Sequence, residues 1–202
     1  MNVKYKYKTK PYKHQEIALQ KSQGKKEYGY FMEMGTGKSK VLIDELGILY
    51  LKGEINFALI IAPKGVYRNW VSKEIPEHMS QEVPHRVIRW VANPNKTQQT
   101  ELQSIKKSFS GLTIFVMNVE AFSTIKGKKA GVWLGGALGS FGLIAIDEST
   151  TIKNHKAKRS KNLVNISEKF KYKRILTGSP ITRSPLDIYQ QCEFLRLTYL
   201  AV

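Results

Sequence analysis

A glycine-rich segment near the N-terminus has the residue types that bind the phosphates of a nucleotide. Residues 32–39 read MEMGTGKS and lie between an expected strand and an expected helix. Glycines allow backbone N–H groups to turn toward phosphate oxygens, and the following helix adds the positive end of its dipole. In such a loop Lys38 would contact the β- and γ-phosphates of ATP, and the Ser39 hydroxyl would coordinate Mg²⁺. The residues expected to surround the phosphates are Met34, Gly35, Thr36, Gly37, Lys38 and Ser39.

ATP chemistry also needs an acidic side chain at the end of a strand. The strict phosphate-loop pattern has glycine where this chain has Met32, so the loop alone leaves open a glycine-rich turn that binds nothing. Asp147 and Glu148 follow the apolar run Leu143–Ile146, at the edge where ligands of open α/β sheets bind. Asp147 would order the Mg²⁺ shell, and Glu148 would orient and deprotonate an attacking water. Together the two halves favour ATP hydrolysis over a structural turn.

The net charge of the chain points to a polyanionic partner. Lys and Arg number 33 and Asp and Glu 16, which gives a net charge of +17, more than solubility requires. Residues 1–26 hold eight lysines and one acid, and residues 153–174 hold nine basic residues and one acid. This balance favours nucleic acid over a membrane surface or an acidic protein. The alternative is a set of scattered lysines that contact only solvent.

Short apolar runs alternate with longer helical stretches along the 202 residues. A chain of this length forms about one domain and can bury its own core. Runs such as Phe57–Ala62 are apolar throughout, which is typical of strands buried on both faces of a parallel sheet. The sequence therefore predicts one α/β domain over residues 1–202, with helices on both faces of a parallel sheet. The expected strands are Tyr28–Met32, Phe57–Ala62, Arg86–Val91, Leu112–Met117, Gly142–Ile146 and Tyr172–Leu176. The expected helices are Lys13–Gln23, Lys38–Leu51, Gly65–Met79, Thr97–Phe109, Lys156–Phe170 and Ser184–Leu197.

Two further segments have patterns of their own. Gly127–Gly142 holds four more glycines between its ends and predicts a loop that leads into a strand. Lys4–Lys8 alternates lysine with tyrosine, which predicts an edge strand whose tyrosines pack on the domain. Stacking of those tyrosines on DNA is the alternative. Trp70 is expected to lie in the core or between lobes.

Several classes of protein are disfavoured by the sequence. No apolar run reaches the ~18 residues of a membrane span, and the charged N-terminus is not followed by the apolar core of a secretion signal. Cys192 is the single cysteine and cannot form an internal disulfide, so a reducing intracellular compartment is expected. The four histidines lack the spacing of metal ligands.

The motifs, taken in order, resemble the first RecA-like lobe of a superfamily II helicase, most similar to the Swi/Snf-type DNA translocases. That family does not require glycine at position 32. Residues 117–120 are a weaker match to another strand-contacting motif, and the resemblance spans roughly residues 11–197. The matching segments are 11–15 (PYKHQ) for the Q motif, 33–39 for motif I, 59–64 with 69–70 for motif Ia, 147–154 for motif II, and 176–182 with 188–189 and 193–195 for motif III.

The resemblance implies an ATP-binding lobe, with Mg²⁺, of a DNA-dependent ATPase that moves along DNA. It makes Gln15 the expected adenine contact and Lys64 and Asn118 the expected contacts to nucleic acid. A strand-separating helicase, or a nucleic-acid-binding module with a vestigial ATPase, is the alternative function. The residues expected to couple nucleotide state to motif III are Thr150, Thr177, Gly178 and Ser179.

Two departures from the family pattern shape these expectations. The family usually has histidine at the fourth position of motif II, where this chain has Thr150. Motifs IV to VI, which carry the arginine finger on a second lobe, have no match here. Arg183 is the nearest rival for the finger. We therefore expect a first lobe that hydrolyses ATP slowly by itself, with sequence-nonspecific duplex DNA and a second RecA-like lobe, in cis or in trans, as partners.

Overall fold

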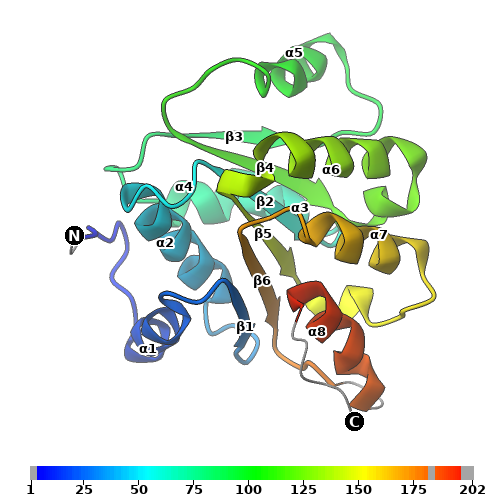
Figure 1. The fold of residues 1–202 in the computed structure, drawn as a ribbon. Helices are drawn as coiled ribbons and strands as arrows, with labels where there is room; N and C mark the ends of the chain where they lie inside the picture. The colour runs from blue at the N-terminus through cyan, green and yellow to red at the C-terminus, as the bar shows by residue number, and fades with distance from the viewer. Residues whose placement is uncertain (1–3, 182–184, 197–202) are drawn as a thin grey trace.

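The computed structural model describes residues 4–181 and 185–196. Its centre is one sheet of six strands in the order β1-β6-β5-β2-β4-β3. Every neighbouring pair is parallel, and helices cover both faces (Figure 1). The expected α/β class is thereby confirmed. The strands are β1 (Glu27–Phe31), β2 (Phe57–Ala62), β3 (His85–Arg89), β4 (Leu112–Asn118), β5 (Gly142–Asp147) and β6 (Tyr172–Thr177).

The central strands separate two hydrophobic cores. Along β2, Phe57, Leu59 and Ile61 belong to one core, and Ala58, Ile60 and Ala62 belong to the other. All six residues of β2 are buried, as are all six of β5. Successive side chains of a strand point to opposite faces, so a continuously apolar run is needed where both faces are covered.

Each core is closed by its own set of helices. The first core receives side chains from α1, α2 and the segment 67–79, and the second receives them from α6, α7 and α8. The segment α5 carries no buried residue. The helices are α1 (Lys13–Ser22), α2 (Lys38–Leu51), α3 (Tyr67–Asn69), α4 (Ile75–His78), α5 (Lys96–Ser104), α6 (Ile125–Leu138), α7 (Lys158–Ser167) and α8 (Tyr189–Leu195).

The expected boundaries of β2 and α2 are reproduced residue for residue, and the other expected strands shift by one or two residues at an end. The expected helix Gly65–Met79 is helical but irregular, since the π-helical turn Trp70–Glu74 separates α3 from α4. The expected C-terminal helix divides into a 3₁₀ turn, Pro185–Ile188, and α8. Its first residue and Arg183 lie outside the described residues.

The prediction of a loop over Gly127–Gly142 was wrong, because most of this segment is helix α6. The Thr124 hydroxyl caps the helix by accepting from the Gly127 N–H at 3.1 Å. Glycines at positions 127, 131, 135 and 139 recur every four residues, so they share one side of the helix. A Cβ at Gly127 would lie 2.2 Å from the Ala121 carbonyl oxygen. The glycines allow close packing and do not mark a loop.

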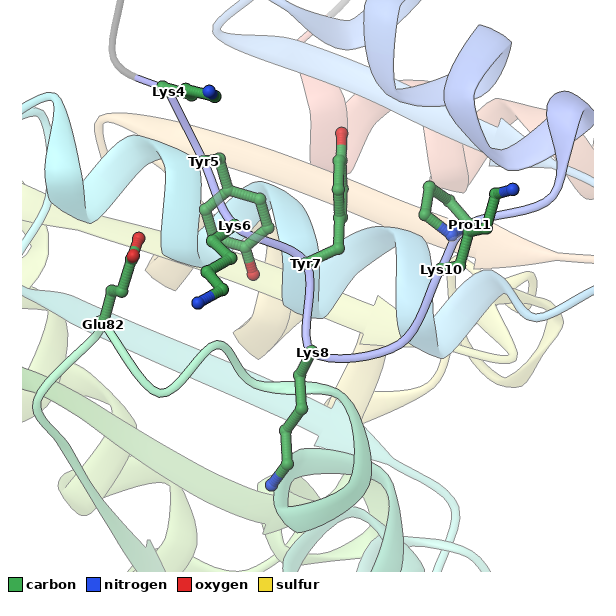
Figure 2. A pocket seen from close by; sticks show the side chains of 8 residues that line it. All are labelled: Lys4, Tyr5, Lys6, Tyr7, Lys8, Lys10, Pro11 and Glu82. Atoms are coloured by element: carbon green, nitrogen blue, oxygen red, sulfur yellow. The ribbon is translucent and has the colours of Figure 1, made fainter.

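The expected edge strand Lys4–Lys8 was also wrong, since this segment runs without regular secondary structure. It lies across α2, beside a cleft of about 760 Å³ (Figure 2). The Tyr5 hydroxyl donates to Asp44 on α2 at 3.2 Å, and Thr9 is bonded to His78 of α4 at 2.8 Å. Tyr5 packs against the first core, in agreement with packing on the domain. Side-chain contacts, and not pairing to the sheet, hold the segment in place.

Candidate nucleotide site

The glycine-rich loop joins the end of β1 to the start of α2. Gly35 and Gly37 have φ values of 77° and 81°, in the left-handed region that glycine enters at little cost. Gly37 immediately precedes the first turn of α2. The backbone N–H groups of that first turn have no partner within the helix. The loop therefore has the backbone form that cradles an anion at a helix N-terminus.

Lys38 lies inside this loop. Its Nζ donates to the carbonyl oxygens of Met32 and Glu33, each at 3.1 Å, and the residue is 8% exposed. An ammonium group has three donors, so these two bonds leave one donor. The chain thus holds a buried cation beside the N-terminus of α2, where it would stabilise a bound phosphate through a charge-assisted hydrogen bond.

Asp147 ends β5 and accepts a hydrogen bond on each carboxylate oxygen. The indole Nε1–H of Trp70 donates to Oδ2 at 2.9 Å, and the Glu148 N–H donates to Oδ1 at 3.0 Å. Burial raises the pKa of Asp147, and the Trp70 hydrogen bond opposes that effect. Glu148 has φ 50° and ψ 60°. A non-glycine residue in the left-handed region is strained, and such strain concentrates at functional sites.

The phosphate loop and the carboxylates line one cleft of about 390 Å³. It is smaller than the cleft beside the N-terminal segment, but that larger cleft is lined mainly by lysines and tyrosines and lacks the loop. The segment 66–78, which the sequence analysis did not assign to the site, contributes as well. The lining residues are Met34, Gly35, Gly37, Lys38, Ser39, Val66, Lys73, Glu74, Glu77, His78, Asp147 and Glu148.

The oxygen donors in this cleft fit a magnesium ion that is held mostly by phosphates and water. Ser39 and Asp147 both line the cleft, and hydroxyl and carboxylate oxygens suit Mg²⁺, which binds through few protein ligands. Within the described residues, no group of three His, Cys, Asp or Glu could hold a metal ion by itself.

Comparison with known proteins decides the family. A model of the SNF2-related domain matches residues 16–202. This chain belongs to the SNF2-related domain family. It is a helicase-like ATPase domain, and the expected resemblance to Swi/Snf-type proteins is confirmed. No helix within the described residues is long and apolar enough to cross a membrane.

Individual relatives are distant and much longer than this chain. It is 28% identical over 166 residues to "DNA annealing helicase and endonuclease ZRANB3" of Bos taurus, covering 81% of the chain and 14% of that protein. It is 28% identical over 177 residues to "Putative protein p41" of Acyrthosiphon pisum secondary endosymbiont phage 1, covering 80% of the chain and 34% of that protein. The chain thus spans about a seventh and about a third of these two relatives.

A solved structure confirms the RecA-like fold. The Sulfolobus solfataricus SWI2/SNF2 ATPase core, solved in complex with dsDNA, superposes with a TM-score of 0.69 at 19% identity. The match covers 94% of this chain and 36% of that one.

In this SNF2-related domain the expected adenine contact is already bonded to the phosphate loop. Gln15 is 4% exposed, its Nε2 donates to the Thr36 carbonyl at 2.9 Å, and its Oε1 accepts from the Tyr12 N–H at 2.9 Å. The exposed His14 also bonds the Thr36 carbonyl at 2.9 Å. A Gln amide has a second N–H and a further lone pair, so the adenine role stays a prediction beside this structural one.

The expected coupling residues at the end of β6 lie directly against the phosphate loop. Thr177 pairs with Phe31 of β1, and its carbonyl accepts from the Met32 N–H at 3.2 Å. Its hydroxyl accepts from the Ser179 N–H at 3.2 Å. A Cβ on Gly178 would lie 3.2 Å from the Met34 side chain. The end of β6 is therefore in direct contact with the residues at the start of the phosphate loop.

A link that the sequence analysis did not foresee joins motif II to motif III. Thr150 is half-buried in the 3₁₀ turn Ser149–Ile152, and its neighbour Ser149 makes the connection by donating to Gln191 Oε1 at 2.6 Å. The Gln191 Nε2 donates in turn to the Pro180 carbonyl at 2.8 Å. Gln191 is fully buried. The sequence of α8, YQQCEFL, places two glutamines side by side and does not indicate which of them makes these bonds.

The two expected nucleic-acid residues lie together at the ends of β2 and β4. Lys64 and Asn118 line the same cleft, of about 360 Å³, and both bond to Glu120. The Asn118 amide donates to Oε2 at 3.1 Å, and the Lys64 N–H donates to Oε1 at 3.4 Å. Burial alone would raise the pKa of Glu120, but hydrogen bonds from its own backbone, Asn118 and Lys64 lower it. The Lys64 side chain remains exposed.

Proposed function

We propose that this chain binds Mg²⁺–ATP and, together with a second RecA-like lobe in cis or in trans, couples its hydrolysis to movement along duplex DNA. The observation that carries the proposal is the single cleft shared by the phosphate loop and the Asp147–Glu148 pair. Membership of the SNF2-related domain family supports it. So do the name of the ZRANB3 relative and the dsDNA bound to the SWI2/SNF2 core.

The chain's own residues divide the work of phosphoryl transfer. Lys38 donates to the phosphates once its bonds to the loop carbonyls are exchanged, which neutralises charge on the transferred group. Ser39 and Asp147 would hold Mg²⁺, which would neutralise negative charge on the phosphates when bound. Glu148 holds the attacking water and takes its proton. No residue of this chain matches the arginine finger of the family, a group that is worth roughly 10³–10⁵ in rate.

DNA contact is assigned to the cleft at the ends of β2 and β4. Lys64 supplies an exposed positive charge beside Asn118, and the net charge of +17 draws a polyanion to the molecule. Contacts of this kind bind the phosphate backbone and carry no base sequence. Movement along DNA requires the second lobe, because closure of two lobes on one nucleotide provides the hinge.

Titration with a fluorescent ATP analogue in the presence of Mg²⁺ tests the proposal. Lys38→Ala should weaken binding at least ~10-fold, since charge-assisted contacts contribute roughly 1.5–3 kcal/mol. Lys128→Ala, which removes an exposed lysine from α6 on the other face of the sheet, is the matched control and should bind as the wild type does. Equal affinity in the wild type and Lys38→Ala would refute the assignment.

A further inference from the structure

Trp70 and Asp147 lie 77 positions apart in the chain and meet in the core beside the nucleotide cleft. The indole Nε1–H donates to Asp147 Oδ2 at 2.9 Å. Trp70 is fully buried and Asp147 is 6% exposed, so this hydrogen bond is shielded from bulk solvent. A hydrogen bond from a neutral donor to a buried carboxylate is among the stronger kinds in proteins.

Trp70 is held in an irregular helical turn. Trp70–Glu74 is π-helical, and the Ile75 N–H donates to the Trp70 carbonyl five residues earlier. Pro76 follows, and because it has no N–H it cannot continue the α-helical bonding pattern. Single π-helical turns inside α-helices occur frequently at functional sites. This turn contributes Lys73 and Glu74 to the cleft, and α4 contributes Glu77 and His78.

The two hydrogen bonds to Asp147 fix the orientation of its carboxylate group. Oδ2 is held by Trp70 and Oδ1 by the Glu148 N–H. A carboxylate has about four acceptor positions, so both oxygens keep a lone pair, and Asp147 also lines the cleft. Backbone N–H groups hold many carboxylates, but here the second donor is a side chain that can be replaced without altering the backbone.

We propose that Trp70 is a positioning residue for the metal-binding carboxylate, a role that rests on the proposed function of the cleft. Its indole N–H orients Asp147 so that the free lone pairs meet a nucleotide-bound Mg²⁺. Side chains that donate a hydrogen bond to a metal ligand typically contribute 10–100-fold to metal affinity. The Trp70 N–H therefore affects the Mg²⁺ concentration that nucleotide binding requires. It does not affect the affinity of the phosphate loop for nucleotide in the absence of Mg²⁺.

The test compares Trp70→Phe, which removes the N–H and keeps an aromatic ring, with Trp133→Phe on α6, where the ring is 42% exposed. Fluorescent-nucleotide affinity is measured at a series of Mg²⁺ concentrations and in excess chelator. Trp70→Phe should raise the half-saturating Mg²⁺ concentration about 10-fold and leave the affinity in chelator unchanged. Trp133→Phe should change neither quantity.

Each other outcome has a definite meaning. An unchanged Mg²⁺ requirement in Trp70→Phe, or an equal loss of affinity with and without Mg²⁺, overturns the positioning role while the nucleotide site stands. Wild-type protein that binds no nucleotide overturns the proposed function, and the inference with it. If Trp70→Phe does not fold, the ¹H–¹⁵N indole resonance of Trp70 in wild-type protein decides. It should move when Mg²⁺ is added to the nucleotide complex, and a stationary resonance contradicts the proposal.

Discussion

The side-chain amide of Gln15 donates to the carbonyl of Thr36 at 2.9 Å, which ties helix α1 to the phosphate loop. The amide lies so close that a Cβ on Gly37 would be 2.3 Å from Gln15 Nε2. Glycine at position 37 is favoured by its φ of 81°, and a side chain there would also displace the Gln15 amide from its bond to Thr36. The Q-like segment supports the shape of the loop, whatever it contributes to base recognition.

Gln15→Ala should weaken binding of both ATP and GTP, because the loop loses an anchoring hydrogen bond. A net contribution of ~0.5–1.5 kcal/mol corresponds to about 2–10-fold in affinity. A larger loss for ATP than for GTP would measure the adenine contact in addition. Competition titrations against a fluorescent nucleotide provide the values, with Gln20→Ala, an exposed residue of α1, as control. Unaltered affinity for both nucleotides would contradict the anchoring role.

Two glycines of α6 should respond to alanine in opposite directions. In Gly127→Ala the new Cβ would lie 2.2 Å from the backbone oxygen of Ala121, so the helix must shift, and overpacking of this kind costs about 1–3 kcal/mol. Around Gly136 the nearest atom is the end of the Lys169 side chain at 3.8 Å. Gly136→Ala should therefore stabilise by about 0.5–1 kcal/mol. Urea unfolding of the two variants measures both values, and equal midpoints would show that α6 is not packed as described.

Removing one partner of the buried pair Lys40–Asp44 should lower the free energy of unfolding strongly. Replacing both partners with uncharged residues should lower it much less. The Lys40 Nζ lies 2.5 Å from Asp44, and their side chains are 6% and 2% exposed. Burial raises the pKa of Asp44 despite the opposing effect of Lys40. Lys40→Met leaves a buried carboxylate without its cation and should lower the free energy of unfolding by about 3–5 kcal/mol.

The double variant Lys40→Met/Asp44→Asn should regain most of that stability, because it buries no charge and its amide oxygen can still accept from Tyr5. Denaturant unfolding of the single and double variants gives the comparison. A double variant as unstable as Lys40→Met would show that the loss comes from packing and not from the uncompensated charge.

Glu54 and Lys171 form a pair whose contribution depends on pH. Hydrogen bonds from Lys171 and Tyr172 lower the pKa of Glu54 below its ordinary value of 4.5. A lowered pKa means that the stabilisation is present above the unfolded value and is lost as pH falls through the folded one. The side chains are 41% and 32% exposed, so the contribution stays below about 1 kcal/mol. The difference in unfolding midpoint between wild type and Glu54→Gln should be constant near neutral pH and should disappear as pH falls below 4.5 and through the lowered pKa of folded Glu54. A difference that persists at low pH would contradict this.

Binding to duplex DNA should be sensitive to salt and indifferent to sequence. Each phosphate neutralised by Lys or Arg changes the slope of log K against log salt by about −0.9. Lys64→Ala should therefore reduce the magnitude of that slope by about one and weaken binding to all sequences alike. Fluorescence anisotropy with shuffled duplexes at several salt concentrations measures this. A marked preference for one sequence, or affinity independent of salt, would count against the assignment.

Local patterns determined much of this protein before its structure was known. The continuous apolar run Phe57–Ala62 required a strand buried on both faces, and β2 is that strand. The glycines, lysine and serine of residues 35–39 specified a turn into a helix, and α2 begins at Lys38. Such features follow from backbone geometry and burial within a few residues, so a sequence suffices to predict them. The prediction of a loop over Gly127–Gly142 failed for a different reason. Glycines spaced by four residues indicate a closely packed helix only when it is known that a second element lies against them.

Tertiary structure alone decided the hydrogen-bond partners of Trp70 and Gln191. Trp70 was expected in the core or between lobes, but its partner was not foreseen. Its indole N–H donates to the carboxylate of Asp147, 77 residues away in the chain. Gln191 bridges motifs II and III, and nothing in the sequence YQQCEFL of α8 distinguishes it from its neighbour Gln190. Both links join elements from distant parts of the chain that the strand order β1-β6-β5-β2-β4-β3 brings together. A side chain's partner across the fold depends on crossover order and on helix rotation, and neither is encoded in the local run of residues.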